Sequence, residues 1–304
     1  MSNKNIRNQI EKLKKEKNAV ILAHSYQNLE IDEVADYTGD SLQLSRLAAS
    51  TDADIIVFCG VYFMAETAKI LSPNKKVLLP NVKSGCRMAD MIDLAQIRKF
   101  KSEHPDIPVV CYVNSTAEVK SESDICCTSS NALKVVKNLG AKEILFVPDT
   151  YLGTWVGSQL PEVKIIPYPG YCPTHLNIRA EDVLNKKAEN PRAIVLAHPE
   201  CHKSVVDLAD FAGSTTQMMD FVFKSKEKEF IIATEKGVVD RLSRDLPDKK
   251  IIHVSNKAVC PNMKRHYLED VLTCLQEEQY EINVDEALAK KALLSIERMF
   301  ELCK

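Results

Sequence analysis

Residues 19–27 read AVILAHSYQ, and residues 192–201 read RAIVLAHPEC. Each stretch is a short apolar run that ends in a histidine, with a second proton-transfer group two positions further on. An apolar run of this length between polar residues is typical of a strand buried inside a parallel sheet. The recurrence indicates two copies of one α/β unit.

A third copy lies between these two and begins with PVVCYVNST at 108–116. In each copy a hydroxyl-rich turn opens a helical pattern, and a second apolar run, a shorter helix and a third run follow. This β-α-β-α-β order predicts a parallel sheet with helices on both faces. We therefore expect an α/β fold of three homologous three-layer αβα domains with parallel sheets around a pseudo-threefold axis.

The spacing of corresponding residues supports triplication. Cys86 and Cys172 are 86 residues apart, and Cys172 and Cys260 are 88 apart. His24 and His198 are separated by 174 residues, as are Cys86 and Cys260. The predicted units are 18–107, 108–190 and 191–283, which carry Cys86, Cys172 and Cys260 respectively, with terminal helices at 1–17 and 284–304.

Composition excludes several classes of protein. The 304 residues carry a net charge of −2 without a long basic run, which argues against a nucleic-acid partner. No stretch reaches the roughly 18 apolar residues that span a bilayer, and the N-terminus lacks a signal-peptide pattern. We expect a cytoplasmic protein without membrane contact. Ten cysteines in such a chain are thiols or metal ligands rather than disulfides, and no CxxC occurs.

Three of these cysteines are candidate metal ligands. Cys86, Cys172 and Cys260 each follow the third apolar run of a unit and precede a predicted helix, which favours a thiolate. Ligands of open α/β sheets bind beyond the carboxyl ends of the strands, so the three thiols are expected to meet in one central cavity. They could hold an iron–sulfur cubane with one open iron, or zinc with an open position. The alternative is that they are buried core cysteines.

Further polar groups are expected at the same cavity. The first strands end at His24 and Tyr26, at Tyr112 and Asn114, and at His198 and Glu200, which include candidate acids and bases. Hydroxyl groups open the following helices at Ser41, Ser129, Ser214 and Thr215. They could be helix caps, or they could bind anions at the helix N-termini. Cys126, Cys127 and Cys201 break the threefold pattern, and we predict that they are not ligands.

Over nearly the whole chain, the sequence resembles the quinolinate synthase family. The resemblance rests on AHSYQ, GDSLQLS, YVNS, CTSSNA, PGYCPTH, HPEC, GSTTQM and VCPNMK. It implies an enzyme of NAD biosynthesis that condenses iminoaspartate with dihydroxyacetone phosphate to quinolinate, phosphate and water. It also implies an oxygen-sensitive [4Fe–4S] cluster, with the open iron as a Lewis acid. The resemblance leaves open whether an aspartate oxidase or dehydrogenase hands over the iminoaspartate directly.

The resemblance assigns roles to individual residues. Cys86, Cys172 and Cys260 are expected to bind the cluster, and Glu200 and Tyr26 to transfer protons with assistance from His198 and His24. The expected substrate-binding residues are His24, Ser41, Tyr112, Asn114, Ser129, His175, His198, Glu200, Ser214 and Thr215. Some members carry a CxxCxxC run before the last cluster cysteine, but this chain has Val254 and Lys257 there. A thiol switch based on that run is therefore absent.

Two other functions remain open at this point. A zinc hydrolase could use the three cysteines and a water molecule. A non-catalytic iron–sulfur sensor could use the same ligands, although the sequence offers no DNA-reading helix or basic patch as an output element.

Overall fold

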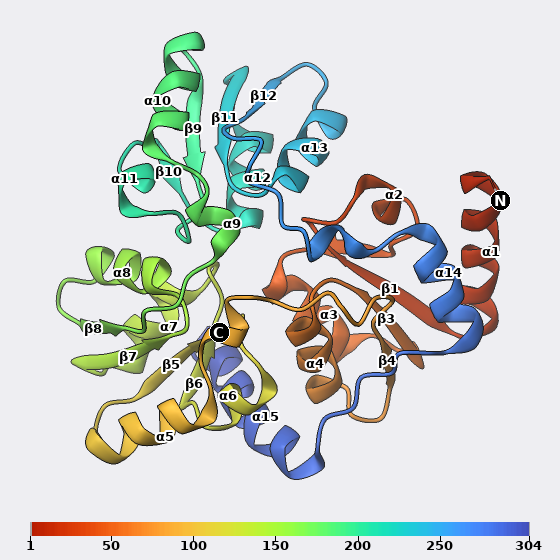
Figure 1. Ribbon diagram of the computed structural model, residues 1–304, viewed down its shortest axis with the longest axis horizontal. Helices are drawn as coiled ribbons and strands as arrows, with labels where there is room; N and C mark the ends of the chain where they lie inside the picture. Colours follow the sequence, from red (N-terminus) through yellow and green to blue (C-terminus); the bar gives the residue numbers. More distant parts are fainter. Residues whose placement is uncertain (1, 304) are drawn as a thin grey trace.

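A computed structural model describes residues 2–303 of the chain. Figure 1 shows three α/β lobes around a common centre, with β1–β4 at the right, β5–β8 at the lower left and β9–β12 at the top. We call these lobes the first, second and third repeat. Across the described residues, each repeat holds one four-stranded parallel sheet.

The first repeat has the strand order β2-β1-β3-β4. Its strands are β1 (Ala19–His24), β2 (Tyr37–Gly39), β3 (Ile55–Cys59) and β4 (Lys76–Leu78). Its connecting helices are α2 (Leu29–Asp32), α3 (Ser41–Ser50) and α4 (Tyr62–Leu71). Every residue of β3 and all but the first of β1 are buried, as expected for strands covered on both faces.

The second repeat has the matching order β6-β5-β7-β8. Its strands are β5 (Val109–Tyr112), β6 (Ile125–Cys127), β7 (Glu143–Val147) and β8 (Lys164–Pro167). The helices between them are α6 (Ala117–Ser121), α7 (Ala132–Leu139) and α8 (Thr150–Gln159).

The third repeat has the order β10-β9-β11-β12. Its strands are β9 (Ile194–Ala197), β10 (Phe211–Ala212), β11 (Glu229–Ala233) and β12 (Lys250–His253). Helices α11 (Lys203–Val206), α12 (Thr215–Lys224) and α13 (Lys236–Asp245) join them. The identical order of the three sheets confirms the predicted fold class.

Each sheet contains one strand more than the sequence pattern revealed. The additional strands β2, β6 and β10 are only two or three residues long and lie at the edge of their sheets. They come just before the hydroxyl-rich helix starts, and a segment this short has too few residues to show an apolar run. Their effect is to bring these helix starts beside the carboxyl end of the first strand.

The helix that follows each of Cys86, Cys172 and Cys260 packs on the next repeat. Helix α5 (Leu94–Glu103) contacts α6 of the second repeat, and α10 (Ala180–Glu189) contacts β11 of the third. Helix α14 (Leu268–Glu277) returns to β3 of the first repeat and closes the ring. The unit boundaries predicted along the chain therefore do not follow which sheet each helix covers.

The two terminal helices complete the outer layers. Helix α1 (Asn3–Glu16) packs against α14 and β1. Helix α15 (Glu286–Glu301) packs against α6 and β6 of the second repeat, where Figure 1 shows it beside both. No helix within residues 2–303 is both long and apolar enough to cross a bilayer.

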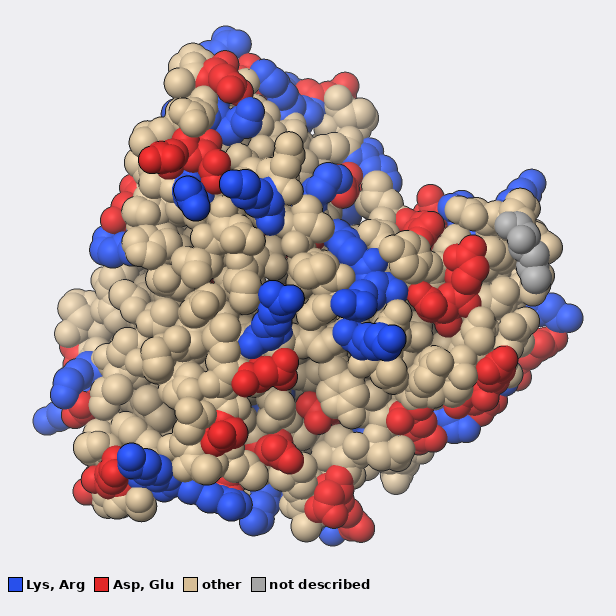
Figure 2. Space-filling view, viewed as in Figure 1, with Lys and Arg blue, Asp and Glu red and all other residues tan. Residues whose placement is uncertain are grey.

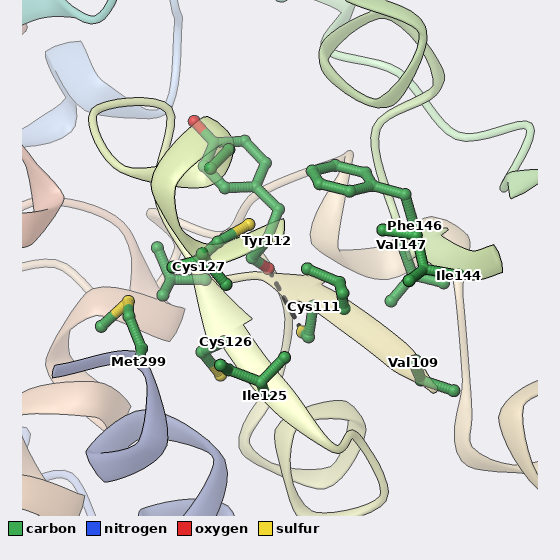
Figure 3. Packing of buried hydrophobic residues seen from close by; sticks show 14 of the residues in the cluster. Val109, Cys111, Tyr112, Ile125, Cys126, Cys127, Ile144, Phe146, Val147 and Met299 are labelled. Atoms are coloured by element: carbon green, nitrogen blue, oxygen red, sulfur yellow. Dashed lines mark hydrogen bonds between the residues drawn. The ribbon is translucent and has the colours of Figure 1, made fainter. Parts of the chain in front are cut away.

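Three further cysteines belong to the core of the second repeat. Figure 3 shows Cys111, Cys126 and Cys127 among aliphatic side chains, close to Met299 of α15. All three thiols are fully buried. The Tyr112 side chain points away from them, so its hydroxyl leaves the core at the end of β5.

Candidate active site

The carboxyl ends of the strands face a central cavity of about 470 Å³. Every repeat contributes a first-strand end, a helix start and a cysteine to its wall. The predicted site residues that line it are His24, Tyr26, Ser41, Cys86, Tyr112, Asn114, Ser129, Cys172, His175, His198, Glu200, Thr215 and Cys260. Ser214 is the one predicted site residue outside this lining within residues 2–303, and it lies directly before Thr215.

The three cavity cysteines share one local structure. Each precedes a single helical turn, namely η1 (Ala89–Met91), α9 (Pro173–Leu176) or η2 (Met263–Arg265). Backbone N–H groups of the turn donate to each sulfur: Ala89 and Met88 to Cys86, His175 to Cys172, and Met263 and Asn262 to Cys260. The long helices that the sequence suggested begin only after these turns, so the turns themselves orient the thiols.

Two buried carboxylates hold the backbone at two of these cysteines. Glu235 Oε1 accepts a hydrogen bond from the Cys260 N–H at 3.1 Å. The Asp149 carboxylate accepts one from the Cys172 N–H. Both side chains are fully buried and follow the third strand along the chain in their repeats. These two carboxylates therefore fix the backbone of Cys172 and Cys260 from behind the cavity wall.

The donor set fits a metal group that binds thiolates. All ten cysteines are free of disulfides, and the three cavity thiols are close enough to influence one another's charge. Burial raises the pKa of the Cys86 thiol to about 12, and it raises the pKa of Cys172 and Cys260 as well. Without a cation the thiols remain protonated, whereas a metal ion displaces these protons. The N–H donors are then placed to stabilise the sulfur charge.

His24 and His198 have equivalent hydrogen bonds. The Tyr26 N–H donates to His24 Nδ1 at 3.1 Å, and the Glu200 N–H donates to His198 Nδ1 at 3.2 Å. Burial lowers the pKa of His24 to about 4 and that of His198 to about 3. Both rings are thus neutral at pH 7 with the proton on Nε2, which makes each a hydrogen-bond donor to a ligand.

Glu200 is the main acceptor of the site. The Tyr112 hydroxyl donates to its Oε1 at 2.6 Å, and His175 Nδ1 lies 2.8 Å from its Oε2. Burial acts to raise the pKa of Glu200, but the His175 and His198 rings and the Tyr112 hydroxyl outweigh it and hold the pKa below its ordinary value. Glu200 is therefore ionised and able to accept a proton.

His175 connects the carboxylate to a cysteine. Its Nδ1 is 3.2 Å from Cys172 Sγ, and its ring stacks on His198 with centroids 4.8 Å apart. Ligand atoms of Cys172, His175 and Glu200 all lie within 4.8 Å of one another, so this group could hold a metal ion. The sequence predicted each of the three residues at the site, but it did not indicate that they form this group.

Tyr26 does not contact Glu200 directly. Its hydroxyl is 2.9 Å from Thr234 Oγ1 and accepts a hydrogen bond from Thr215 Oγ1 at 3.0 Å. Burial raises the pKa of Tyr26 well above its ordinary range, so the phenol keeps its proton. Thr234 was not predicted, because a threonine after a strand carries no signal of its own.

The three helix starts converge near the cavity. The hydroxyls of Ser41 and Ser129 line it and make no hydrogen bond to another residue in the span 2–303. The Ser214 hydroxyl instead accepts from the Gln217 N–H, as a cap of α12, and donates its own proton to Ser130 Oγ at 2.9 Å. Ser130 in turn donates to Asp40 at 2.7 Å, which links the helix starts of all three repeats.

Asn114 provides a free acceptor at the cavity. Its Oδ1 is buried and has no hydrogen-bond partner among the described residues. A buried amide oxygen without a partner is costly, and a bound ligand that donates to it would remove this cost.

Known proteins match this chain over nearly its whole length. The family model described as quinolinate synthetase A protein matches residues 8–301. A quinolinate synthase of Alkaliphilus metalliredigens is 52% identical over 99% of this chain and 100% of its own length. Those of Dehalococcoides mccartyi and Caldicellulosiruptor saccharolyticus are 53% and 50% identical, each over 98% of both chains.

Proposed function

Because the chain belongs to the quinolinate synthetase A family of NAD biosynthesis, we propose that it condenses iminoaspartate with dihydroxyacetone phosphate to form quinolinate, phosphate and water. The observation that carries this proposal is the joint composition of the cavity wall. Three thiols, three imidazoles, two carboxylates and two phenols from three repeats face one volume of about 470 Å³.

We assign Cys86, Cys172 and Cys260 as the ligands of a [4Fe–4S] cluster. The N–H donors at all three sulfurs support this choice, since each thiol is prepared to carry charge. When bound, such a cluster keeps one iron without a protein ligand, which can act as a Lewis acid. We assign His175 and Glu200 to each other rather than to metal, because they already share a 2.8 Å contact.

The remaining residues of the wall recognise the anionic groups of the substrates. Two carboxylates and one phosphate enter together, and the free hydroxyls of Ser41 and Ser129 lie at helix N-termini that favour negative charge. The Nε2–H groups of His24 and His198 add two donors that need no charge of their own. Asn114 accepts from an amino or hydroxyl group of the substrate.

Glu200 and Tyr26 carry out proton transfer in this proposal. Ring formation requires a tautomerisation and the loss of two water molecules, so the site must both remove and supply protons. Glu200 is ionised and accepts the proton, while Tyr26 is a neutral phenol and donates one. Tyr112 keeps the Glu200 carboxylate in place through its 2.6 Å hydrogen bond.

The Cys172–His175–Glu200 group favours one rival, a hydrolytic zinc enzyme. Colour separates the two, because an iron–sulfur cubane is brown and zinc is colourless. The test is anaerobic purification with iron and sulfide analysis, followed by a quinolinate assay on the two substrates. Colourless protein that contains zinc and makes no quinolinate would reject the proposed function.

Cysteine variants test the ligand assignment. Cys86→Ala, Cys172→Ala and Cys260→Ala are each expected to lose the chromophore and quinolinate formation. Cys303→Ala is the matched control, because Cys303 is also half-buried but lies near the end of α15. If the control lost its iron while one of the three variants kept it, the assignment would be wrong.

A further inference from the structure

The segment that carries Cys86 receives less support from its own repeat than the other two cysteine segments. The N–H groups of Cys172 and Cys260 donate to buried carboxylates, which are the second residues after β7 and β11. The matching position after β3 is Val61, whose side chain offers no acceptor. The first repeat therefore leaves the backbone at Cys86 without the carboxylate that holds the other two ligands.

Asn262 of the third repeat supplies a hydrogen bond at this point. Its Nδ2 donates to Gly85 O, directly before Cys86, at 2.7 Å. Its Oδ1 accepts from Arg265 Nε at 3.1 Å, so the amide nitrogen is the end that faces the carbonyl. Its backbone N–H donates to the Cys260 sulfur. One residue thus contacts both the carbonyl before Cys86 and the sulfur of Cys260.

The second repeat has a comparable link to its neighbours. Thr174, like Asn262, lies two positions after a cavity cysteine, and its hydroxyl donates to the Cys260 sulfur. Tyr168 of the same segment donates to Met91 O at 2.7 Å, at the end of the turn that follows Cys86. Side chains therefore join the three cysteine segments in pairs, and Asn262 is the link between the first and the third.

We propose that Asn262 is a positioning residue that places Cys86 relative to Cys260 across the junction of the first and third repeats. It acts through the carbonyl before Cys86. The inference rests on the proposed function in one respect, which is that these cysteines bind the cluster. Because Asp149 and Glu235 still hold the other two ligands, Cys86 is the ligand that is released first when the amide is removed.

Asn262→Asp tests the amide nitrogen alone. The side chain keeps its size and an oxygen for Arg265, but an oxygen replaces the donor at Gly85 O and repels that carbonyl. The full-length protein, purified anaerobically, is treated with iodoacetamide, and peptide mass spectrometry gives the initial alkylation rate of each cysteine. We expect the rate at Cys86 and the rate of iron loss to a chelator each to rise about tenfold, the range for one lost hydrogen bond. The initial rates at Cys172 and Cys260 should change less than about threefold, since their own bonds remain.

Asn138→Asp is the matched control. Asn138 Nδ2 also donates to a backbone carbonyl, Leu302 O at 2.8 Å, but it joins α7 to the end of α15, outside the cavity wall. This control should leave iron loss and every alkylation rate unchanged. Thermal unfolding is measured on every sample. If Asn262→Asp does not fold, Asn262→Ala removes the donor without adding a charge and is expected to show the same selective rise at Cys86.

The outcomes distinguish the inference from the proposed function. Protein without iron, or without quinolinate formation, rejects the function. Alkylation then reports on the metal-free chain, in which Cys86 is still expected to react faster after Asn262→Asp. An unchanged rate at Cys86, or an equal rise at all three cavity cysteines, overturns the positioning role. A rise that includes the buried thiols of Cys111 and Cys127 also overturns it, because it shows general loosening of the fold. A rise confined to Cys86 supports it.

Discussion

His266 is a buried histidine outside the cavity, placed where the third repeat crosses to the first. Its Nε2–H donates to Gly60 O at 2.7 Å, and its Nδ1 has no partner among residues 2–303. Burial lowers the pKa of His266 to about 4. The ring is therefore neutral at pH 7, and charging it inside the protein is unfavourable.

This histidine should make stability depend on pH. An unfolded histidine takes up a proton as the pH falls below about 6.5, whereas folded His266 does so only near pH 4, so its contribution to stability is lost on acidification between these values. From pH 7 to pH 5 the loss from this residue is about 2 kcal/mol. In His266→Gln the free energy of unfolding, measured in urea, should fall by about that much less over this interval.

His104→Gln, at an exposed position, is the matched substitution and is measured in parallel. An identical fall in the original protein and in His266→Gln would show that His266 is not the residue responsible.

At the scale of single residues, the sequence identifies site residues that occupy equivalent positions in the repeats. It misses site residues that occur in one repeat only. The cysteines and His24 with His198 are visible because they occupy equivalent positions. Thr234 has Gly60 and Pro148 at the matching positions after β3 and β7, so no pattern singles it out. Only the packing of three repeats brings it between Tyr26 and His175.

Among the elements, the three helices that start at the cavity share one hydrogen bond at their N-termini. In each, a backbone N–H donates to the side-chain oxygen of the residue three positions further on. The pairs are Asp40 with Gln43, Thr128 with Asn131, and Ser214 with Gln217. At Asp40 and Ser214 the side chain also accepts from the backbone N–H three residues further on, which completes a capping box. Thr128 makes no such return bond, and α7 has Asn131 as its N-cap. The shared bond leaves Ser41 and Ser129, one position after Asp40 and Thr128, free to face the cavity.

Ser129→Ala should therefore weaken substrate binding without loss of iron. Removing one hydrogen bond to a charged group costs about 1.5–3 kcal/mol, which corresponds to a KM raised roughly tenfold to a hundredfold. The measurement is KM for each substrate, together with iron content.

Asp93→Ala is the control at a capped helix remote from the cavity, because Asp93 caps α5 in the same way. It should lower stability by about 1 kcal/mol and leave KM unchanged. A normal KM in Ser129→Ala would show that this hydroxyl does not bind the substrate.

The longer elements were predictable and the shortest were not. Runs such as Ile55–Cys59 are apolar throughout and mark strands by themselves. By contrast β10 has two residues, and the turns after the cysteines have three or four. Such pieces are stabilised by neighbouring structure rather than by their own pattern, and they set the final geometry of the thiols and hydroxyls.

For the whole molecule, closure of the third repeat on the first depends on a glycine. A Cβ atom on Gly237 would lie 2.8 Å from both Ser25 O and Tyr26 Cα. Arg241 Nε donates to Ser25 O at 2.9 Å, and Lys264 Nζ donates to Tyr26 O at 2.5 Å. These contacts hold the segment that carries Tyr26 against α13 and η2.

Gly237→Ala should push these two repeats apart and displace Tyr26. We expect stability to fall by about 1–3 kcal/mol, as in other overpacked interiors, and turnover per iron to fall up to about a hundredfold. Thermal unfolding and quinolinate formation per cluster measure the two effects.

Gly157→Ala on α8 serves as the comparison, since its Cβ would meet only the Ile165 side chain, at 3.1 Å from the nearest atom. Unchanged turnover in Gly237→Ala would mean that the cavity tolerates movement between these repeats.

The threefold plan was visible in the sequence, but the exchange of helices between repeats was not. Equivalent spacings report which segments correspond, whereas α5, α10 and α14 look alike whether they cover their own sheet or the next one. The choice depends on long-range packing, for example of Val271 and Leu275 with Ile21 and Val57.

Figure 2 shows lysines and arginines gathered near the middle of one face, over the region where Figure 1 places the connection into α14. Lys264 in this connection approaches Glu235 Oε1 at 3.4 Å, in addition to its bond to Tyr26 O. The same connection carries Cys260, so the segment that joins the third repeat to the first also holds the third proposed ligand.

The return of α14 to the first sheet has a consequence for biosynthesis. During synthesis, β1 and β3 leave the ribosome early. The apolar face that α14 covers stays uncovered until residue 277 has left the exit tunnel. We expect the nascent chain to wait in an unfinished state that chaperones shield, and prematurely terminated products to be degraded rather than to persist as smaller folded proteins. Insertion of the proposed cluster would then be a late, post-translational event, since Cys260, its third proposed ligand, arrives with the segment that finishes the first repeat.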